Sequence, residues 1–181
     1  MPYTAPSLGG GERERVKARP IFAGVVAVVA GFAGTPALAG DPDFLAFSAG
    51  GFDIDDDRTT AQFRVEYRSD FRRFYVAPML GLMVNADGGV YGYGGLYLDL
   101  YFGRRWVVTP NLAVGGYSRG SSKELGNTVE FRSAIEFAYR FDNRARLGIA
   151  VDHISNASLG SDNPGTESVV LTLSVPMSIL F

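Results

Sequence analysis

Long stretches in which apolar and polar residues alternate one by one constrain this chain more than any other feature of its sequence. From residue 129 to 141 the odd positions are mostly large and apolar, whereas the even positions include Glu130, Arg132 and Glu136. Alternation with a period of two is the pattern of a β-strand that has one apolar and one polar face. A helix of the same sequence would spread its charges around the whole circumference and could not bury an apolar stripe. The pattern therefore predicts strands.

Eight segments of this kind follow one another along the chain. We expect strands at about 43–53, 60–69, 74–84, 90–102, 106–117, 128–141, 145–156 and 167–180. Most of the connections alternate between tight turns and longer loops rich in Asp, Gly, Ser and Asn. Short turns at one end and long loops at the other are typical of an outer-membrane barrel. In such a barrel the last strand is expected to be apolar and to run to the terminal Phe181.

The charged residues decide which face of these strands points inwards. Arg64, Glu66 and Arg68 lie on the polar face of one segment, and a charge placed in lipid costs about 2–4 kcal/mol near the bilayer midplane. They must fill the interior, where eight strands leave room only for packed side chains. The prediction is an all-β fold: an eight-stranded antiparallel transmembrane β-barrel with a packed polar interior. A soluble sandwich or lipocalin-like barrel, with the apolar face inside, is the alternative that alternation alone does not exclude.

The first residues predict the destination of the protein. A basic stretch, residues 13–19, precedes a 14-residue apolar run at 21–34 and the tripeptide Ala37-Leu38-Ala39. This order is that of a secretory signal peptide. The run is shorter than the ~20 residues of a membrane-spanning helix, which argues against the alternative of a membrane anchor. We expect a signal peptide at 1–39, cleavage near Ala39, and a barrel domain at 40–181 in a bacterial outer membrane.

The composition excludes several kinds of function. The net charge of −2 gives a nucleic-acid partner no electrostatic support. The chain has no cysteine, so disulfides and thiolate chemistry are excluded. Glu66, Glu130 and Glu136 alternate with arginines, which indicates packed ion pairs rather than the carboxylate pair of a glycosidase.

The acidic segment at 53–57 raises the question of a bound metal. Asp53, Asp55, Asp56 and Asp57 are close together, but the glycine and distal glutamate of an EF-hand loop are missing. We read this segment as a solvated outer loop and predict neither a metal nor a cofactor.

The only histidine of the chain belongs to an unusual group of polar residues. His153 and Ser155 fall on the apolar, lipid-facing positions of one strand, and Glu167 falls on those of the next strand. Polar groups on that face are costly and suggest a function, and a hairpin brings the three side chains together. An imidazole can take the proton of a serine, and a carboxylate can orient the imidazole. The alternative is a solvated cluster at the level of the lipid headgroups.

The residues around this group resemble a known family. His153-Ile154-Ser155-Asn156-Ala157, then Asn163-Pro164-Gly165 and then Glu167 are similar to the active-site segment of the lipid A 3-O-deacylases, the PagL family. The resemblance implies that Ser155, His153 and Glu167 are catalytic. It implies oxyanion or substrate contacts for Asn163 and, more weakly, for Asn156. Read without the resemblance, Asn163-Pro164-Gly165 is also an ordinary turn. Ser158 departs from the motif, where a small residue such as glycine is expected.

The predicted function is that of an outer-membrane esterase. It would hydrolyse the 3-position ester-linked acyl chain of lipid A through an acyl-Ser155 intermediate, with lipopolysaccharide approaching sideways from the outer leaflet. One alternative is a non-enzymatic small barrel, an OmpA-like anchor or adhesin. Another is a different lipid-modifying barrel, such as a phospholipase or acyltransferase. The acyl length and the oligomeric state, a homodimer included, stay open.

Overall fold

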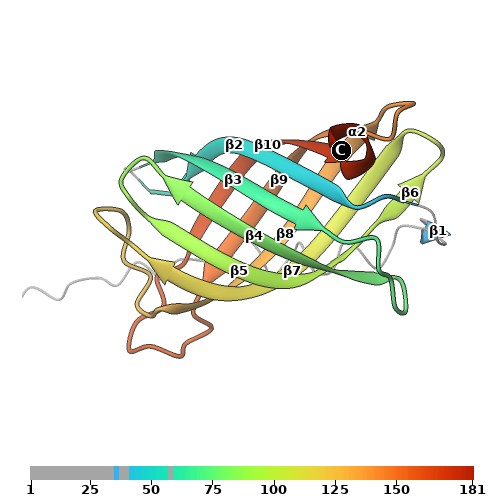
Figure 1. Cartoon of the computed structure of the whole chain (residues 1–181). Coiled ribbons are helices and arrows are strands. Elements are labelled where there is room, and N and C mark those ends of the chain that lie inside the picture. The colour runs from blue at the N-terminus through green and yellow to red at the C-terminus, as the bar shows by residue number, and fades with distance from the viewer. Residues whose placement is uncertain (1–34, 37–40, 57–58) are drawn as a thin grey trace, which may run out of the picture. The chain divides into compact units, whose positions relative to one another are not determined.

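The computed structural model describes residues 35–36, 41–56 and 59–181. Within them, antiparallel strands close into a barrel (Figure 1). The strands are β2 (Phe44–Phe52), β3 (Thr60–Arg68), β4 (Val76–Asn85), β5 (Val90–Leu98), β6 (Leu100–Phe102), β7 (Trp106–Ser118), β8 (Val129–Arg140), β9 (Arg146–Ser155) and β10 (Thr166–Pro176). Because β6 continues the pairing of β5 along β7, these two form one barrel strand. The barrel therefore has eight strands, as the sequence predicts.

Closure comes from the pairing of the last barrel strand with the first. Residues 168–176 of β10 pair with the whole of β2, with Val170 opposite Gly50, and every other strand pairs with its neighbour in the chain. A closed barrel satisfies the backbone hydrogen bonds of its strands internally, which is the condition for crossing a bilayer with strands. In the part of the chain that the structure describes, no helix is long and apolar enough to cross a membrane.

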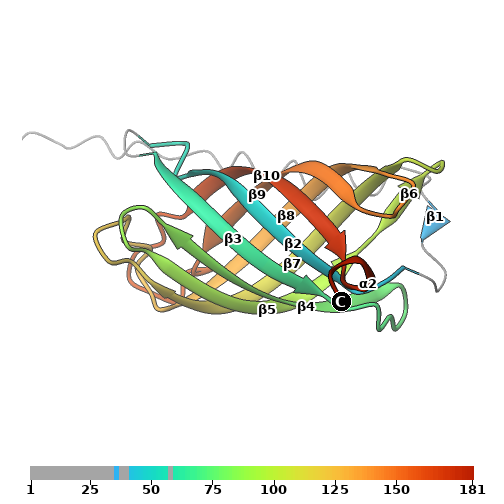
Figure 2. The ribbon, with the colours of Figure 1, turned by 45° about the horizontal axis from the view of Figure 1, so that its top comes forward.

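The two ends of the barrel differ. The longer loops of the β2–β3, β4–β5, β7–β8 and β9–β10 connections gather at one end, and the end of the chain lies at the other (Figure 2). The predicted signal peptide, residues 1–39, falls outside the described residues except for β1 (Thr35–Pro36). This two-residue strand pairs with Tyr101 and Leu100 of β6.

The last strand is shorter than the sequence predicts. β10 stops at Pro176, opposite the first residue of β2, and Met177–Leu180 form the short helix α2. The Met177 N–H donates a hydrogen bond to the carbonyl of Asp43, the residue that precedes β2, at 2.8 Å. Phe181 follows α2 and is 94 % exposed. The expectation of an apolar strand that runs to Phe181 is therefore wrong.

Inside the barrel, most of the charged side chains form ion pairs. Arg64 pairs with Asp152 at 3.0 Å, and Arg132 lies 3.2 Å from the same carboxylate. Arg68 bridges Glu66 and Glu136, both at 2.7 Å. Such partners stabilise buried charges, so the predicted polar interior is confirmed. The predicted ion pair is wrong for Glu130: its carboxylate is buried without an ion-pair partner among the described residues, because Arg132 pairs with Asp152 and Glu66 instead.

An apolar cluster fills the interior at the long-loop end. Its members there include Phe52, Met83, Tyr117 and Ile154. Leu125, from the loop between β7 and β8, joins them with no exposed surface. That loop is thus anchored in the mouth of the barrel.

The outer surface is apolar, as the alternation predicts. Large side chains on this surface stay more than half exposed, among them Phe63, Leu80, Leu112, Ile149 and Leu171. Such a band suits the hydrocarbon region of a bilayer.

Candidate active site

The three predicted catalytic residues lie on the outer face of the barrel, at the long-loop end. Along β9, Asp152 and Ile154 are buried inside, whereas His153 and Ser155 are partly exposed on the opposite face. Glu167 is the second residue of β10 and is the direct strand partner of His153. The predicted facing of all three residues is therefore confirmed.

His153 and Glu167 form a hydrogen bond. The distance between His153 Nδ1 and Glu167 Oε1 is 2.9 Å, and the two side chains are 29 % and 19 % exposed. A carboxylate at Nδ1 accepts the N–H of that nitrogen, which leaves the proton-accepting role to Nε2. The pair has the geometry of an oriented general base.

Two outward-facing serines flank this histidine. Ser155 follows His153 by two residues on the same face of β9, so the two side chains are neighbours. Ser133 of β8 is the strand partner of His153 on its other side. Ser133 is not among the predicted site residues, although it is the polar exception among the outward positions of β8. It is the natural control for any test of Ser155.

The two predicted asparagines have different surroundings. Asn163 Oδ1 accepts a hydrogen bond from the Asn156 N–H at 3.0 Å. This contact turns the amide nitrogen of Asn163 away from Asn156, where it can act as a donor. The Asn156 side chain is fully buried and donates to the carbonyls of Leu125 and Asp162, both at 2.8 Å. The structure does not bring the Asn156 side chain to the outward group. This side chain instead links the β7–β8 loop to the β9–β10 loop.

A strained turn follows Ser155 directly. Ala157 and Ser158 have φ values of 52° and 65°, and the Leu159 N–H donates to the Asn156 carbonyl at 3.0 Å. A turn with two left-handed central residues normally uses glycine or asparagine. This conformation explains why a glycine is expected at position 158.

Gly165 packs against the imidazole. Its φ is 66°, and a Cβ added there would lie 2.8 Å from His153 Cε1. The sequence gives Gly165 only as a turn residue. The structure shows that its missing side chain makes room for the ring of His153.

The acidic segment is only partly the solvated loop that the sequence predicts. Asp53 is 2 % exposed, and its carboxylate accepts hydrogen bonds from Lys123 Nζ and, at 3.1 Å, from Thr166 Oγ1. The prediction is wrong for Asp53, because an ion pair and a hydroxyl group stabilise its charge below the surface. Asp55 and Asp56 are exposed, as predicted. Among residues 41–56 and 59–181, no three His, Asp or Glu side chains are grouped so as to hold a metal ion.

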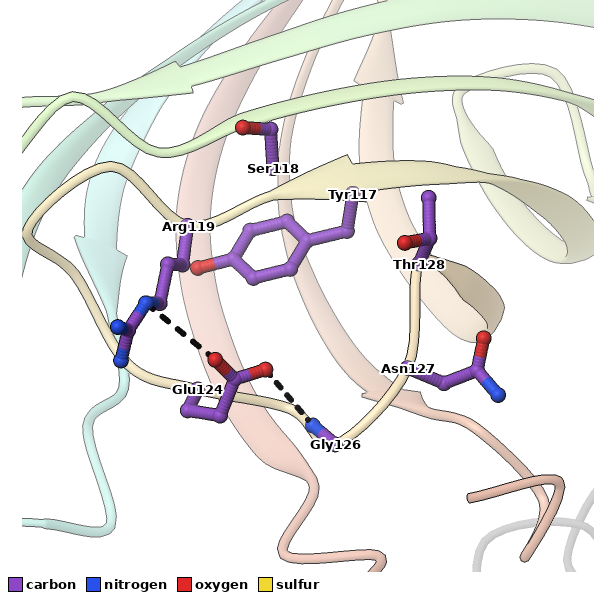
Figure 3. Close-up of a pocket in the computed structure, with 7 residues that line it drawn as sticks. All are labelled: Tyr117, Ser118, Arg119, Glu124, Gly126, Asn127 and Thr128. Carbon is purple, nitrogen blue, oxygen red and sulfur yellow. Dashed lines mark hydrogen bonds and ion pairs between the residues drawn. The ribbon is translucent and has the colours of Figure 1, made fainter.

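A polar cavity of about 510 Å³ lies in the loop between β7 and β8 (Figure 3). Arg119 Nε pairs with a Glu124 carboxylate oxygen at 3.3 Å, and the Gly126 N–H donates to the other oxygen at 3.2 Å. None of the predicted catalytic residues lines this cavity. It is separate from the outward group on β9 and β10.

The fold and the outward His–Glu pair define a small outer-membrane β-barrel with an enzyme-like group on its lipid-facing side. The model of one protein family, described as Lipid A 3-O-deacylase (PagL), matches residues 61–176, and the chain belongs to this family. A search of curated protein sequences found no significant match.

Two solved structures support the fold. The crystal structure of the outer membrane enzyme PagL superimposes with a TM-score of 0.59 at 17 % identity, covering 74 % of this chain and 99 % of that one. A structure from the de novo design of transmembrane β-barrels gives a TM-score of 0.54 at 12 % identity, covering 78 % of this chain and 100 % of the other. At these identities the likeness concerns the fold alone.

Proposed function

We propose that this protein is an esterase that removes the 3-position ester-linked acyl chain of lipid A in the outer membrane, with Ser155, His153 and Glu167 as its triad. We also propose that a signal peptide ending near Ala39 exports it. The observation that carries the proposal is the 2.9 Å hydrogen bond between His153 and Glu167 on the outer face, beside Ser155. A polar group on the lipid-facing side does not stabilise the barrel, since apolar side chains would suit lipid better there. Its presence in a chain of this family therefore favours a catalytic role.

The chemistry follows from the order of these groups. Ser155 Oγ attacks the carbonyl carbon of the ester, and His153 Nε2 takes the hydroxyl proton. Collapse of the tetrahedral intermediate breaks the bond to the sugar oxygen, which leaves with the proton held by His153. Water then attacks the acyl-Ser155 ester, again with His153 as base, and releases the fatty acid. Glu167 holds the imidazole in the required tautomer and stabilises its cation.

Asn163 is the proposed oxyanion donor. Its amide oxygen is held by the Asn156 N–H, so its amide nitrogen is directed by a fixed contact. An amide donor needs no change of protonation during the reaction. We assign Asn156 the supporting role of fixing this orientation through its backbone.

The substrate is proposed to arrive from the lipid rather than through the barrel. Ile149, Val169 and Leu171 continue the outward face of β9 and β10 beyond the catalytic group and form an apolar track for an acyl chain. Val169→Asp should therefore reduce hydrolysis of lipid A about tenfold, because an acyl chain lying on the track would have to bury the new carboxylate. Hydrolysis of a short soluble ester should change little. Equal loss on both substrates would argue against the track.

Mass spectrometry of lipid A tests the function. Lipid A incubated with the purified full-length protein in detergent should lose the 3-position acyl chain only. Loss of a phospholipid acyl chain would instead indicate a phospholipase, and gain of an acyl chain an acyltransferase. Unchanged lipids would favour the non-enzymatic anchor or adhesin.

A further inference from the structure

The loop that carries Asp53 is fastened to the strand that carries Glu167. We infer that Asp53 and Lys123 are positioning residues of the site: their ion pair locks two loops onto β10 and so holds Glu167 against His153. This inference rests on the proposed function, because it gives these residues a role in the same reaction. We call Asp53, Lys123 and Thr166 the loop clamp.

The clamp is built from buried polar contacts. The Asp53 and Lys123 side chains are 3 % and 17 % exposed, with 2.5 Å between Lys123 Nζ and Asp53 Oδ1. Thr166 has no exposed surface, and its hydroxyl donates to the same carboxylate oxygen at 3.1 Å. Because Thr166 directly precedes Glu167, the clamp grips β10 at the residue next to the catalytic carboxylate.

The backbone of Glu167 is held from the same loop. The Ile54 N–H donates to the Glu167 carbonyl at 3.1 Å, and the Glu167 N–H donates to Asp55 Oδ1 at 3.4 Å. Asp53 itself has a φ of 60°. A non-glycine residue in this region carries strain that only its surroundings can maintain, and such strain gathers at functional sites. The loop is therefore shaped to reach Glu167.

The other half of the clamp is equally anchored. Lys123 lies two residues before Leu125, whose side chain is buried in the barrel and whose carbonyl accepts from Asn156 Nδ2. Tyr117 OH also donates to the Lys123 carbonyl at 3.0 Å. The ammonium group thus extends from a fixed point in the β7–β8 loop to Asp53 in the β2–β3 loop.

The ammonium group of Lys123 stays charged in its ion pair with Asp53. Burial disfavours its ammonium group, but the hydrogen bond and charge of Asp53, together with the charges of Asp55 and Asp56, raise the pKa of Lys123 above its usual value. Asp56 Oδ2 lies 3.6 Å from the same nitrogen. A lysine held between two carboxylates fixes a geometry, and it is a poor ligand for the phosphates of a lipid headgroup.

Three variants of one loop test the role in catalysis. Lys123→Met removes the charge and keeps the chain length, and Lys123→Arg keeps the charge. Glu124→Gln breaks an exposed ion pair in the same loop as a matched control. With lipid A as substrate, Lys123→Met should lower kcat roughly tenfold, as expected for a misplaced catalytic group. It should leave KM nearly unchanged, because binding groups are untouched.

Lys123→Arg should recover most of the lost kcat, and Glu124→Gln should behave as the wild type. The double variant Asp53→Asn/Lys123→Met removes both charges. Its kcat should be no lower than that of Lys123→Met alone if the two residues act only through their ion pair. A wild-type kcat in Lys123→Met, or an effect on KM alone, would overturn the inference. Wild-type protein that releases no acyl chain would defeat the proposed function instead.

A readout independent of activity follows from the same contact. Trypsin should cut the folded wild-type protein slowly after Lys123, because the residue is held, and Asp53→Asn should speed this cut severalfold relative to the cut after exposed Arg119. Equal rates in both proteins would show that the ion pair does not lock the loop and would overturn the inference. Unboiled samples that keep their faster gel migration would confirm that each variant is a folded barrel.

Discussion

Two groups of charged and polar side chains, one inside the barrel and one on its outer face, have opposite surroundings. Asp152 and His153 are consecutive, yet Asp152 points inwards and His153 outwards. Asp152 has no exposed surface and lies between Arg64 and Arg132, at 3.0 and 3.2 Å. His153 is 29 % exposed and pairs with Glu167 at 2.9 Å, beside an outward serine. Charges that neutralise one another in a packed core hold the fold, whereas partly exposed polar groups on a lipid-facing surface are available for chemistry.

The largest expected effect is loss of activity in the outer group. Ser155→Ala and His153→Ala should each lower deacylation about 10³-fold or more, because the nucleophile and its base act as a unit. Initial rates on lipid A measure this effect, and barrel stability should be unchanged. Ser133→Ala is the matched control, since Ser133 is an outward serine and the strand partner of His153 on β8. The reverse result, with Ser133→Ala inactive and Ser155→Ala active, would move the nucleophile to β8.

The inner group should respond in the opposite sense. Asp152→Asn leaves Arg64 and Arg132 without their shared carboxylate and should destabilise the barrel by about 3–5 kcal/mol. Urea titration followed by the fluorescence of Trp106, the single tryptophan, measures this loss. The folded variant should keep most of its deacylase activity, because Asp152 faces away from the site. A stable but inactive Asp152→Asn variant would contradict the assignment of stability to the inner group and activity to the outer group.

Gly165 allows the position of the His153 ring in the outer group to be tested. Gly165→Ala would place a methyl group 2.8 Å from His153 Cε1 and should lower kcat about tenfold to a hundredfold by displacing the ring. Gly103→Ala is the matched control, because Gly103 has the same φ of 66° with open space around it. Steady-state rates of the two variants separate the contact with His153 from the backbone strain that they share. Equal rates would show that the packing against His153 is unimportant.

The smallest effect concerns the strained turn after Ser155. Ser158→Gly should stabilise the protein by about 1 kcal/mol or less, because a left-handed φ of 65° costs glycine little. Ser161→Gly, at a position without positive φ, should give no such gain. Urea midpoints of the two variants decide the matter, and a gain in both or in neither would remove strain as the explanation.

The sequence was sufficient for everything that depends on a period of two. Alternation determined the strand count, the buried arginines and the outward facing of His153, Ser155 and Glu167, because a side chain in a strand has only two directions. It failed at the end of β10, where Pro176 and the end of the partner strand stop the ladder. The sequence also did not predict the burial of Asp53 or the packing of Gly165 against His153. Their contacts join loops from distant hairpins, and no local pattern in the chain encodes such contacts.

The most direct test of the proposed triad is the site of covalent modification by a serine-directed fluorophosphonate. The folded protein in detergent is treated with the reagent, digested, and the modified peptide is sequenced by mass spectrometry. The proposed triad predicts a single adduct on Ser155 in the wild type and none in His153→Ala, because only a serine activated by its base reacts. An adduct on Ser133, or no adduct in wild-type protein that hydrolyses lipid A, would contradict the outward triad of Ser155, His153 and Glu167.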